Sequence, residues 1–230
     1  MNDKPKSRKT LENNNIKAWD KLYEATNDYV WGKQASPFLR DILRDIVSPI
    51  PTEYNILDAA TGEGRNLPYL VSTGAHVYAC DSSVHALSKI DHDIKGKVEI
   101  TECTLGKTPY KNGKFDIVLL WDVVETLPAP EAVLKEIYRI TSKGGHLICN
   151  IPGKDDGIAK NNMTILNDGG NLYDNRFYYK FYNKLEAWNL LQSAGFKIDM
   201  VNVFEWAEEA HPGFRSYAHV HKNEVFTVSK

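Results

Sequence analysis

The sequence is poor in cysteine, which limits the kinds of protein it can be. It has three cysteines in 230 residues, Cys80, Cys103 and Cys149, and each falls within or at the end of an apolar run. An odd number of widely spaced cysteines excludes a disulfide framework and does not fit the ligand spacing of a zinc site. We expect them to be small core residues in a reducing compartment, so the expected location is cytoplasmic.

An excess of one charge and a long apolar run are also missing. The formal net charge is −2, from 28 basic and 30 acidic residues, and this argues against a general electrostatic contact with nucleic acid. No run is long enough to span a bilayer, and the polar N-terminal segment does not have the apolar core of a signal peptide. We therefore expect no nucleic-acid partner and no membrane partner.

The order of apolar runs predicts the fold class. Strand-like runs alternate with helices from residue 55 to residue 151, after two N-terminal helices at 13–25 and 36–47. Such alternation predicts a parallel sheet with helices on both faces. Beyond a helix at 183–194, the extended runs 196–206 and 217–229 have no helix between them, so they must pair antiparallel.

The expected architecture is therefore α/β: a Rossmann-like, seven-stranded, mostly parallel sheet with an antiparallel last strand. The expected strands are 55–58, 76–81, 98–103, 116–121 and 146–151, followed by the final pair, with helices at 65–72, 84–90 and 131–141. We expect a flexible tail over residues 1–12, an N-terminal helical lid over 13–50 and the main domain over 51–230.

The most informative segment is residues 54–67, YNILDAATGEGRNL. It predicts a short strand ending at Asp58, a tight turn through Gly62 and Gly64, and the start of a helix. Glycine lets the backbone approach a ligand closely, and a helix N-terminus presents unpaired N–H groups. A nucleotide-like cofactor is predicted here, and an ordinary strand–helix turn is the alternative. A dinucleotide site would need a third glycine where Leu67 stands.

This segment resembles a known family signature. Asp58 to Gly64 resembles the D-x-G-x-G-x-G motif of class I S-adenosylmethionine (SAM) methyltransferases, with Ala60 in place of the first glycine. The extension Gly-Glu-Gly-Arg-Asn resembles the tellurite-resistance and thiopurine branch. Residues 115–127, 134–145 and 182–196 resemble further family segments in the family's order. The extra methyl of Ala60 is expected to be tolerated if its φ angle stays negative.

The resemblance implies SAM as cofactor and S-adenosylhomocysteine as product, with a role for several residues. Asp58 would orient the amino group of SAM, and Gly62 and Gly64 would contact its methionine part. A carboxylate at the position of Asp81 can accept both hydrogen bonds of a ribose diol, although it could instead cap the next helix. The predicted cofactor-binding residues are Trp31, Asp58, Ala60, Gly62, Gly64, Asp81, Ser82, Thr104, Leu105 and Trp121.

Aromatic residues near the N-terminus resemble the lid of small-molecule methyltransferases. Their faces suit a sulfonium cation and exclude water. Trp31 lies next to Gly32 in a loop, and this position favours a role in the binding site. Trp19 lies on an amphipathic helix, where an aromatic residue is more typically part of the hydrophobic core. Tyr23, on the same helix, is a predicted acceptor contact.

The loop between the last two strands is the predicted acceptor end. Arg215 suits an anionic or phenolic acceptor, as does Arg176 in the aromatic loop 171–182. Asp122, His211 and His219 are the candidate general bases. His219 and His221 point to one side of a strand, which also permits a metal, but we expect none. The loop is expected to face solvent.

The predicted function is SAM-dependent methylation of a small molecule, anionic or aromatic, at oxygen, nitrogen or sulfur. Two alternatives remain open. One is methylation of tRNA or protein. The other is a non-catalytic SAM-binding protein, suggested by Ala60 and by Thr126, where many relatives have histidine.

Overall fold

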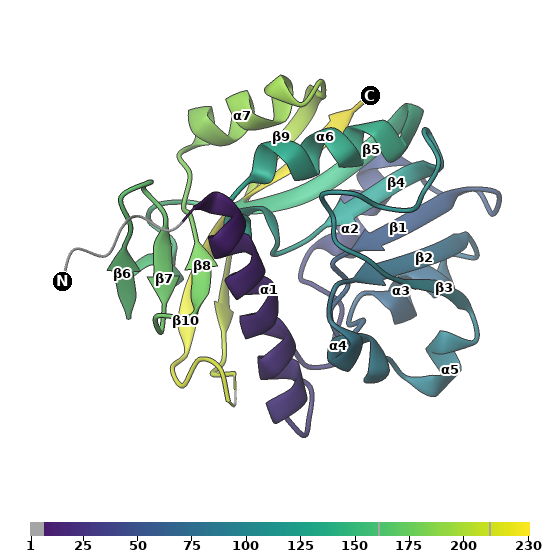
Figure 1. Ribbon diagram of the computed structural model, residues 1–230. Helices are drawn as coiled ribbons and strands as arrows, with labels where there is room; N and C mark the ends of the chain where they lie inside the picture. The colour runs from purple at the N-terminus through teal and green to yellow at the C-terminus, as the bar shows by residue number, and fades with distance from the viewer. Residues whose placement is uncertain (1–6, 161, 212) are drawn as a thin grey trace.

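A seven-stranded sheet forms the centre of the computed structural model, which describes residues 7–160, 162–211 and 213–230 (Figure 1). Its strand order is β3-β2-β1-β4-β5-β10-β9. The first five strands are parallel, and β10 runs antiparallel to both β5 and β9. The strands are β1 (Asn55–Ala59), β2 (His76–Asp81), β3 (Val98–Glu102), β4 (Phe115–Leu120), β5 (Thr141–Pro152), β9 (Lys197–Glu208) and β10 (His219–Ser229). The predicted fold class is confirmed.

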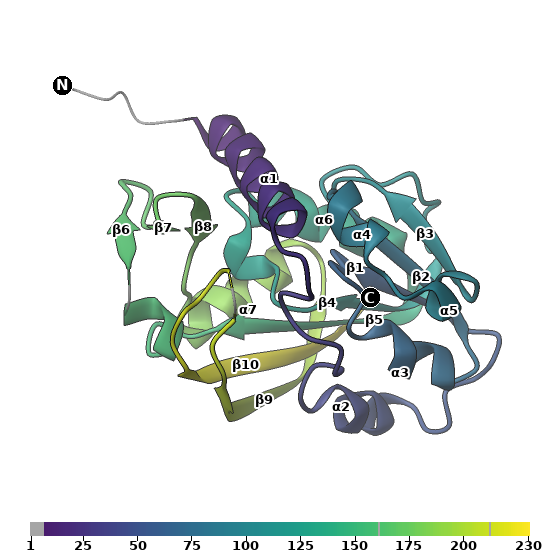
Figure 2. The ribbon, with the colours of Figure 1, turned by 90° about the horizontal axis from the view of Figure 1, so that it is seen from below.

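Helices cover both faces of this sheet because side chains alternate along each strand. On β4, Ile117 and Leu119 pack in one core, whereas Val118 and Leu120 pack in the other. Figure 2 shows α2 and α3 on one side of the sheet and α6 on the other. The helices are α1 (Arg8–Ala25), α2 (Leu39–Ile46), α3 (Leu67–Ser72), α4 (Val84–Ser88), α5 (His92–Lys95), α6 (Pro130–Ile140) and α7 (Lys184–Ser193), with 3₁₀ turns η1 (Val124–Thr126) and η2 (Gly157–Lys160).

Helix ends follow the local sequence in α7. The Asn183 side chain accepts a hydrogen bond from the Glu186 N–H, and the Glu186 carboxylate accepts one from the Asn183 N–H. At the other end Gly195 has φ +110°. The predicted C-terminal stop at this glycine is confirmed.

The N-terminal elements differ from the sequence prediction. The first helix begins at Arg8 and not at residue 13, because Ser7 caps it by accepting from the Thr10 N–H at 3.2 Å. Of the tail predicted over residues 1–12, residues 1–6 lie outside the described residues. The second helix begins three residues late, at Leu39, because Phe38 has φ +64° and cannot belong to a helix.

The aromatic segment after β5 is not a loop, as the sequence analysis expected. It forms strands β7 (Asn171–Tyr173) and β8 (Phe177–Tyr179). Together with β6 (Met163–Ile165) they make a separate three-stranded antiparallel sheet. Phe177 and Tyr179 are buried against α1, in a third core that also includes Leu22 and Val30. Tertiary packing of these rings stabilises strands that have weak local signals.

Helix α1 is attached to the body by a buried asparagine. The Asn15 amide donates to the Thr126 carbonyl at 2.8 Å and accepts from the Tyr178 N–H at 2.8 Å. Figure 1 shows the helix lying between the small sheet and α4. This position places one face of α1 over the carboxyl ends of the central strands.

The three cysteines are free thiols, and Cys80 and Cys149 are buried. Within the described residues, none of the helices is both long enough and apolar enough to cross a lipid bilayer.

Candidate active site

One cavity lies at the carboxyl ends of β1, β2 and β4, with α1 on its other side. It is lined by most of the residues that the sequence analysis selected: Tyr23, Trp31, Asp58, Ala60, Gly62, Asp81, Ser82, Thr104, Leu105, Trp121, Asp122 and Arg215. Four selected residues do not line it: Gly64, Arg176, His211 and His219.

The turn after β1 has the backbone shape that a glycine-rich motif produces. Gly62 has φ +57°, and a Cβ built there would lie 3.0 Å from Tyr23 Oη, so the space above this backbone is limited. Gly64 has φ +80°, and its added Cβ would meet the Leu67 side chain at 2.9 Å. Gly64 therefore serves helix packing on the far side of the turn.

Ala60 departs from the condition set for it. Its φ is +57°, in the left-handed region, whereas its methyl was expected to be tolerated on condition that φ is negative. The left-handed conformation costs a residue with a Cβ about 1–2 kcal/mol. The turn therefore keeps the geometry of the family glycine although the glycine itself is missing.

Two buried carboxylates face the cavity. Burial raises the pKa of Asp58 to about 6, although Thr61 Oγ1 donates to it at 2.6 Å. Burial also raises the pKa of Asp81, which accepts from the Gly62 N–H at 2.8 Å and from the Ser83 N–H at 2.9 Å. The α4 N-cap is Ser83 and not Asp81. A ligand with hydroxyl or ammonium donors would relieve the desolvation of both groups.

The loop before α2 is held over the turn by a glutamate that the sequence analysis did not select. Glu63, 3% exposed, accepts from the Val30 N–H at 2.7 Å and from the Trp31 N–H at 3.3 Å. Lys89 pairs with the same carboxylate at 3.1 Å. The indole N–H of Trp31 donates to Tyr23 Oη at 2.9 Å. The only feature of the sequence that could have indicated this role is the position of Glu63 between the two glycines of the motif.

Asp122, two residues after the end of β4, is held in a strained conformation beside the cavity. Its φ is +55°, and its backbone N–H donates to Asn150 Oδ1 at 2.6 Å. Arg65 donates to its carboxylate at 2.7 Å. Strain of this kind persists only where neighbouring groups impose it, and it is common at functional sites.

Glu125, one turn further on, is buried and lines the same cavity. Burial, together with the charge of Asp122, raises the pKa of Glu125 well above its usual range. Its Oε2 atom has no hydrogen-bond partner among the described residues. A carboxyl group kept neutral by burial can donate a hydrogen bond to a ligand.

Arg215 is buried, which corrects the expectation that its loop faces solvent. It is 2% exposed because the aromatic core below α1 covers it, with the Phe214 ring centre 4.8 Å from its guanidinium carbon. Its Nη2 donates to Tyr179 Oη at 3.1 Å. No carboxylate of the described residues lies within 4.0 Å of it. A buried cation without an acid partner is costly, so this position favours an anionic ligand.

The two selected histidines and Arg176 lie elsewhere. His211 and His219 direct their Nε2 atoms to Glu208 Oε2, at 3.3 and 3.5 Å, whereas His221, on β10, lines the cavity. Arg176 is more than half exposed at the β7–β8 turn and donates to Asp174 at 3.0 Å. The sequence could not show that Arg215 lines the cavity and that these residues do not, because the burial of Arg215 depends on aromatic rings from distant segments.

Comparisons with known proteins agree with this geometry. The family model described as "Methyltransferase domain" matches residues 57–149. A demethylmenaquinone methyltransferase of Streptomyces griseus is 29% identical over 126 residues, which cover 55% of this chain and 54% of that protein. The chain therefore matches about half the length of this relative.

Solved structures share the fold. The 1,6-didemethyltoxoflavin-N1-methyltransferase of Burkholderia thailandensis, solved with 1,6-didemethyltoxoflavin and S-adenosylhomocysteine, has a TM-score of 0.66 at 15% identity and covers 100% of this chain and 93% of that one. The [4+2]-cyclase SpnF has a TM-score of 0.63 at 11% identity, covering 98% and 97%. At such identities the likeness concerns the fold alone.

Residues 57–149 therefore match a methyltransferase domain, and the glycine turn and the two buried acids beside the cavity agree with the class I SAM-dependent methyltransferase superfamily.

Proposed function

We propose that this protein transfers a methyl group from SAM to a small molecule that carries an anionic or phenolic group. The observation that carries the proposal is that one cavity is lined both by Asp58 and Asp81 and by the buried cation of Arg215. The first pair suits the ammonium and ribose groups of SAM, and the cation suits an acceptor of opposite charge.

The residues of the turn fit the cofactor. Asp58 would hold the amino group of SAM and Asp81 its ribose, while the Gly62 backbone, closely covered by Tyr23, would lie against the methionine part. Ser82, Thr104 and Leu105 line the same cavity and would surround the adenine. When bound, SAM supplies an electrophilic methyl group on a sulfonium centre.

The chain's own residues would orient the acceptor and exclude water. Arg215 and the Tyr179 hydroxyl, 3.1 Å apart, would bind an acidic oxygen of the acceptor. Asp122, held by Arg65 and Asn150, is the proposed base for a proton on the attacking atom. A fixed carboxylate can hold that proton without a change of conformation.

Residues 13–50 are proposed to act as a lid. Glu63 accepts hydrogen bonds from the Val30 and Trp31 N–H groups, and the Trp31 indole donates to the Tyr23 hydroxyl. Because Glu63 belongs to the motif turn, these bonds hold the segment over that turn. Bound SAM would stabilise this closed arrangement. Hydrogen exchange at residues 28–32 should slow when S-adenosylhomocysteine is added, and equal exchange would contradict the lid.

The alternatives have less support. A SAM-binding protein without catalytic activity would have no reason to hold Asp122, which lies outside the cofactor turn, in a strained conformation beside the cavity. Methylation of tRNA or protein would require a macromolecule to pass α1 and the Trp31 segment, which cover the cavity. The three free cysteines support the further proposal of a cytoplasmic location.

The test is a turnover screen with phenols, carboxylates, amines and thiols, detecting S-adenosylhomocysteine. For an acceptor that reacts, Arg215→Met should raise the KM about tenfold to a hundredfold, because a charged hydrogen bond is lost. The affinity for S-adenosylhomocysteine should stay within about twofold. Arg176→Met, at an exposed turn, is the matched control. An unchanged KM in Arg215→Met would show that Arg215 does not bind the acceptor.

A further inference from the structure

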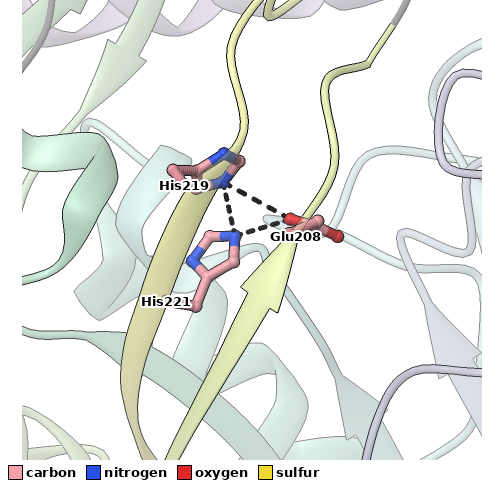
Figure 3. A group of neighbouring side chains, drawn as sticks. All are labelled: Glu208, His219 and His221. Carbon is pink, nitrogen blue, oxygen red and sulfur yellow. Dashed lines mark hydrogen bonds and ion pairs between the residues drawn. The ribbon is translucent and has the colours of Figure 1, made fainter.

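Four side chains that the proposed reaction does not use converge beside the cavity. They form the histidine cluster: Glu208 at the end of β9, His219 and His221 on β10, and His211 in the loop between them. Figure 3 shows Glu208, His219 and His221 pointing toward one another. The Nε2 atoms of His211, His219 and His221 lie 3.3, 3.5 and 2.6 Å from one atom, Glu208 Oε2.

The opposite ring nitrogens each face an acceptor. His211 Nδ1 lies 3.0 Å from the Val30 carbonyl oxygen, and His219 Nδ1 lies 3.4 Å from the Tyr217 carbonyl oxygen. His221 Nδ1 lies 3.2 Å from the buried carboxylate of Asp156. Carbonyl oxygens can only accept, so the protons of His211 and His219 belong on Nδ1. These partners orient the rings in the manner of outer-shell groups at metal sites.

The inner nitrogens therefore present lone pairs to a common point. Arg215 Nη1 lies 3.3 Å from His219 Nε2, and since a guanidinium can only donate, this nitrogen acts as an acceptor. His211 Nε2 is buried and has no hydrogen-bond partner among the described residues. The Nε2 atoms of His219 and His221 are 2.9 Å apart. Lone pairs and a carboxylate brought this close repel one another unless a metal cation or a proton lies between them.

We propose that the histidine cluster binds one divalent transition-metal ion, with Glu208, His219 and His221 as ligands and His211 as the fourth. Imidazole nitrogens bind such an ion at about 2.0–2.1 Å, which separates tetrahedral ligand atoms by about 3.3 Å. The separations among the Glu208, His219 and His221 atoms, 2.6 to 3.5 Å, surround this value, and His211 Nε2 lies 3.3 Å from the same Glu208 oxygen. The donor set of three imidazoles and one carboxylate suits Zn²⁺ and its neighbours rather than Mg²⁺ or Ca²⁺. The sequence analysis expected no metal, and the geometry points the other way.

Metal binding would connect the acceptor end to the lid. Arg215 Nη1 must leave His219 Nε2, while Nη2 can keep its contact with Tyr179 Oη. His211 contacts the Val30 carbonyl, and the Val30 N–H is held by Glu63. The ion would thus fasten the β9–β10 loop over the segment that covers the cavity. This last consequence rests on the proposed function, whereas the metal site itself does not.

The competing state is an ion pair without metal. A protonated His221 could pair with Glu208 and Asp156 and hold the same side chains together. Binding of the ion would displace that proton from His221. Titration with the metal ion distinguishes the two states, because only a metal site binds one equivalent of the ion.

The test uses the whole protein stripped with a chelator and titrated with Zn²⁺ by calorimetry. One ion should bind per chain, and Zn²⁺ at a hundred times its Kd should raise the Tm by roughly 5–10 °C. Co²⁺ should give the intense visible absorption of a four-coordinate ion. Binding of S-adenosylhomocysteine, measured in parallel, needs neither metal nor acceptor and reports separately on the proposed function.

Variants localise the ion. His219→Ala and Glu208→Gln should each lower Zn²⁺ affinity at least a hundredfold, and His211→Ala about tenfold. The matched control is His92→Ala, a fully exposed histidine away from the cluster. Failure of the stripped wild type to bind Zn²⁺ would overturn the proposal whatever the variants do. Undiminished one-to-one binding by folded His219→Ala and Glu208→Gln would overturn it as well.

Discussion

The two ends of the cavity are built in different ways. The proposed cofactor end comes from turns that follow β1, β2 and β4, and its residues lie within one run of alternating strands and helices. The proposed acceptor end joins α1, β8 and the β9–β10 loop, and its hydrogen bonds link Asn15 to Tyr178 and Val30 to His211. The first end depends on local backbone shape, and the second depends on contacts between distant segments.

This difference has consequences for mutation. Changes at the cofactor end should alter ligand affinity with modest effects on the fold, because each turn is shaped locally. Changes at the acceptor end should alter the free energy of unfolding, because each buried polar contact there also fastens two parts of the chain. Four predictions test the contrast, in order of decreasing effect.

The largest effect is expected at Asn15, which holds α1 in place. Asn15→Ala should lower the free energy of unfolding by about 2–4 kcal/mol, because the Tyr178 N–H and the Thr126 carbonyl would both be buried without a partner. Thermal unfolding should show a Tm lower by roughly 5–15 °C. Asn14→Ala, at an exposed neighbouring position, is the control and should leave the Tm nearly unchanged. Equal Tm values for both variants would show that the acceptor end does not depend on this contact.

Asp81 should give the next largest effect, on affinity and not on folding. Asp81→Asn should weaken S-adenosylhomocysteine binding about tenfold to a hundredfold, since charged hydrogen bonds to the ribose are lost. The variant should stay folded, because the amide can still accept from the Gly62 or the Ser83 N–H. Calorimetry measures the change, with the exposed Asp93→Asn as control. Tight NAD binding without SAM binding would contradict the cofactor assignment.

Asp58 should make cofactor binding depend on pH. With a pKa of about 6, its carboxylate is largely neutral at pH 5, so the affinity for S-adenosylhomocysteine should fall about tenfold between pH 7 and pH 5. The effect of pH on the free energy of unfolding has the opposite sign to its effect on affinity. Since folding raises the pKa of Asp58 above its ordinary value of 3.8, the buried charge destabilises the fold as the pH rises from about 4 to about 6.

Asp58→Asn is the control for this pH dependence. Its affinity at pH 7 should be about tenfold lower, because an amide attracts an ammonium group less strongly. The affinity should then change little between pH 7 and pH 5. A pH dependence that persists in Asp58→Asn would assign the titration to another group, for which Asp81 is the nearest choice.

The smallest effect is expected at Ala60, in the opposite direction. Ala60→Gly should raise the free energy of unfolding by about 0.5–1 kcal/mol, because glycine adopts φ +57° without the cost of a Cβ. S-adenosylhomocysteine affinity should not change. Ala59→Gly, one residue earlier in β1, should instead destabilise the protein by about 1 kcal/mol. A lower Tm in Ala60→Gly would show that the methyl of Ala60 contributes packing that exceeds the backbone strain.

Sequence reasoning succeeded where one short segment contains all the information. The bounds predicted for β2, residues 76–81, are those of the structure, and the stop at Gly195 follows from its positive φ. It failed where packing overrides local preference. The aromatic segment 171–182 became strands β7 and β8 because its rings pack under α1, and Phe38 delayed the second helix.

By itself, the sequence determined the fold class, the five parallel strands followed by an antiparallel pair, and the turn residues proposed for the cofactor end of the cavity. These depend on the period of apolar residues and on a turn whose residues are neighbours in the chain. Only the tertiary structure decided that Arg215 is buried, that Glu63 holds the Val30 backbone, and that His211, His219 and His221 face Glu208. Burial and the approach of charges are set by segments that meet only when the chain folds, and no local pattern records them.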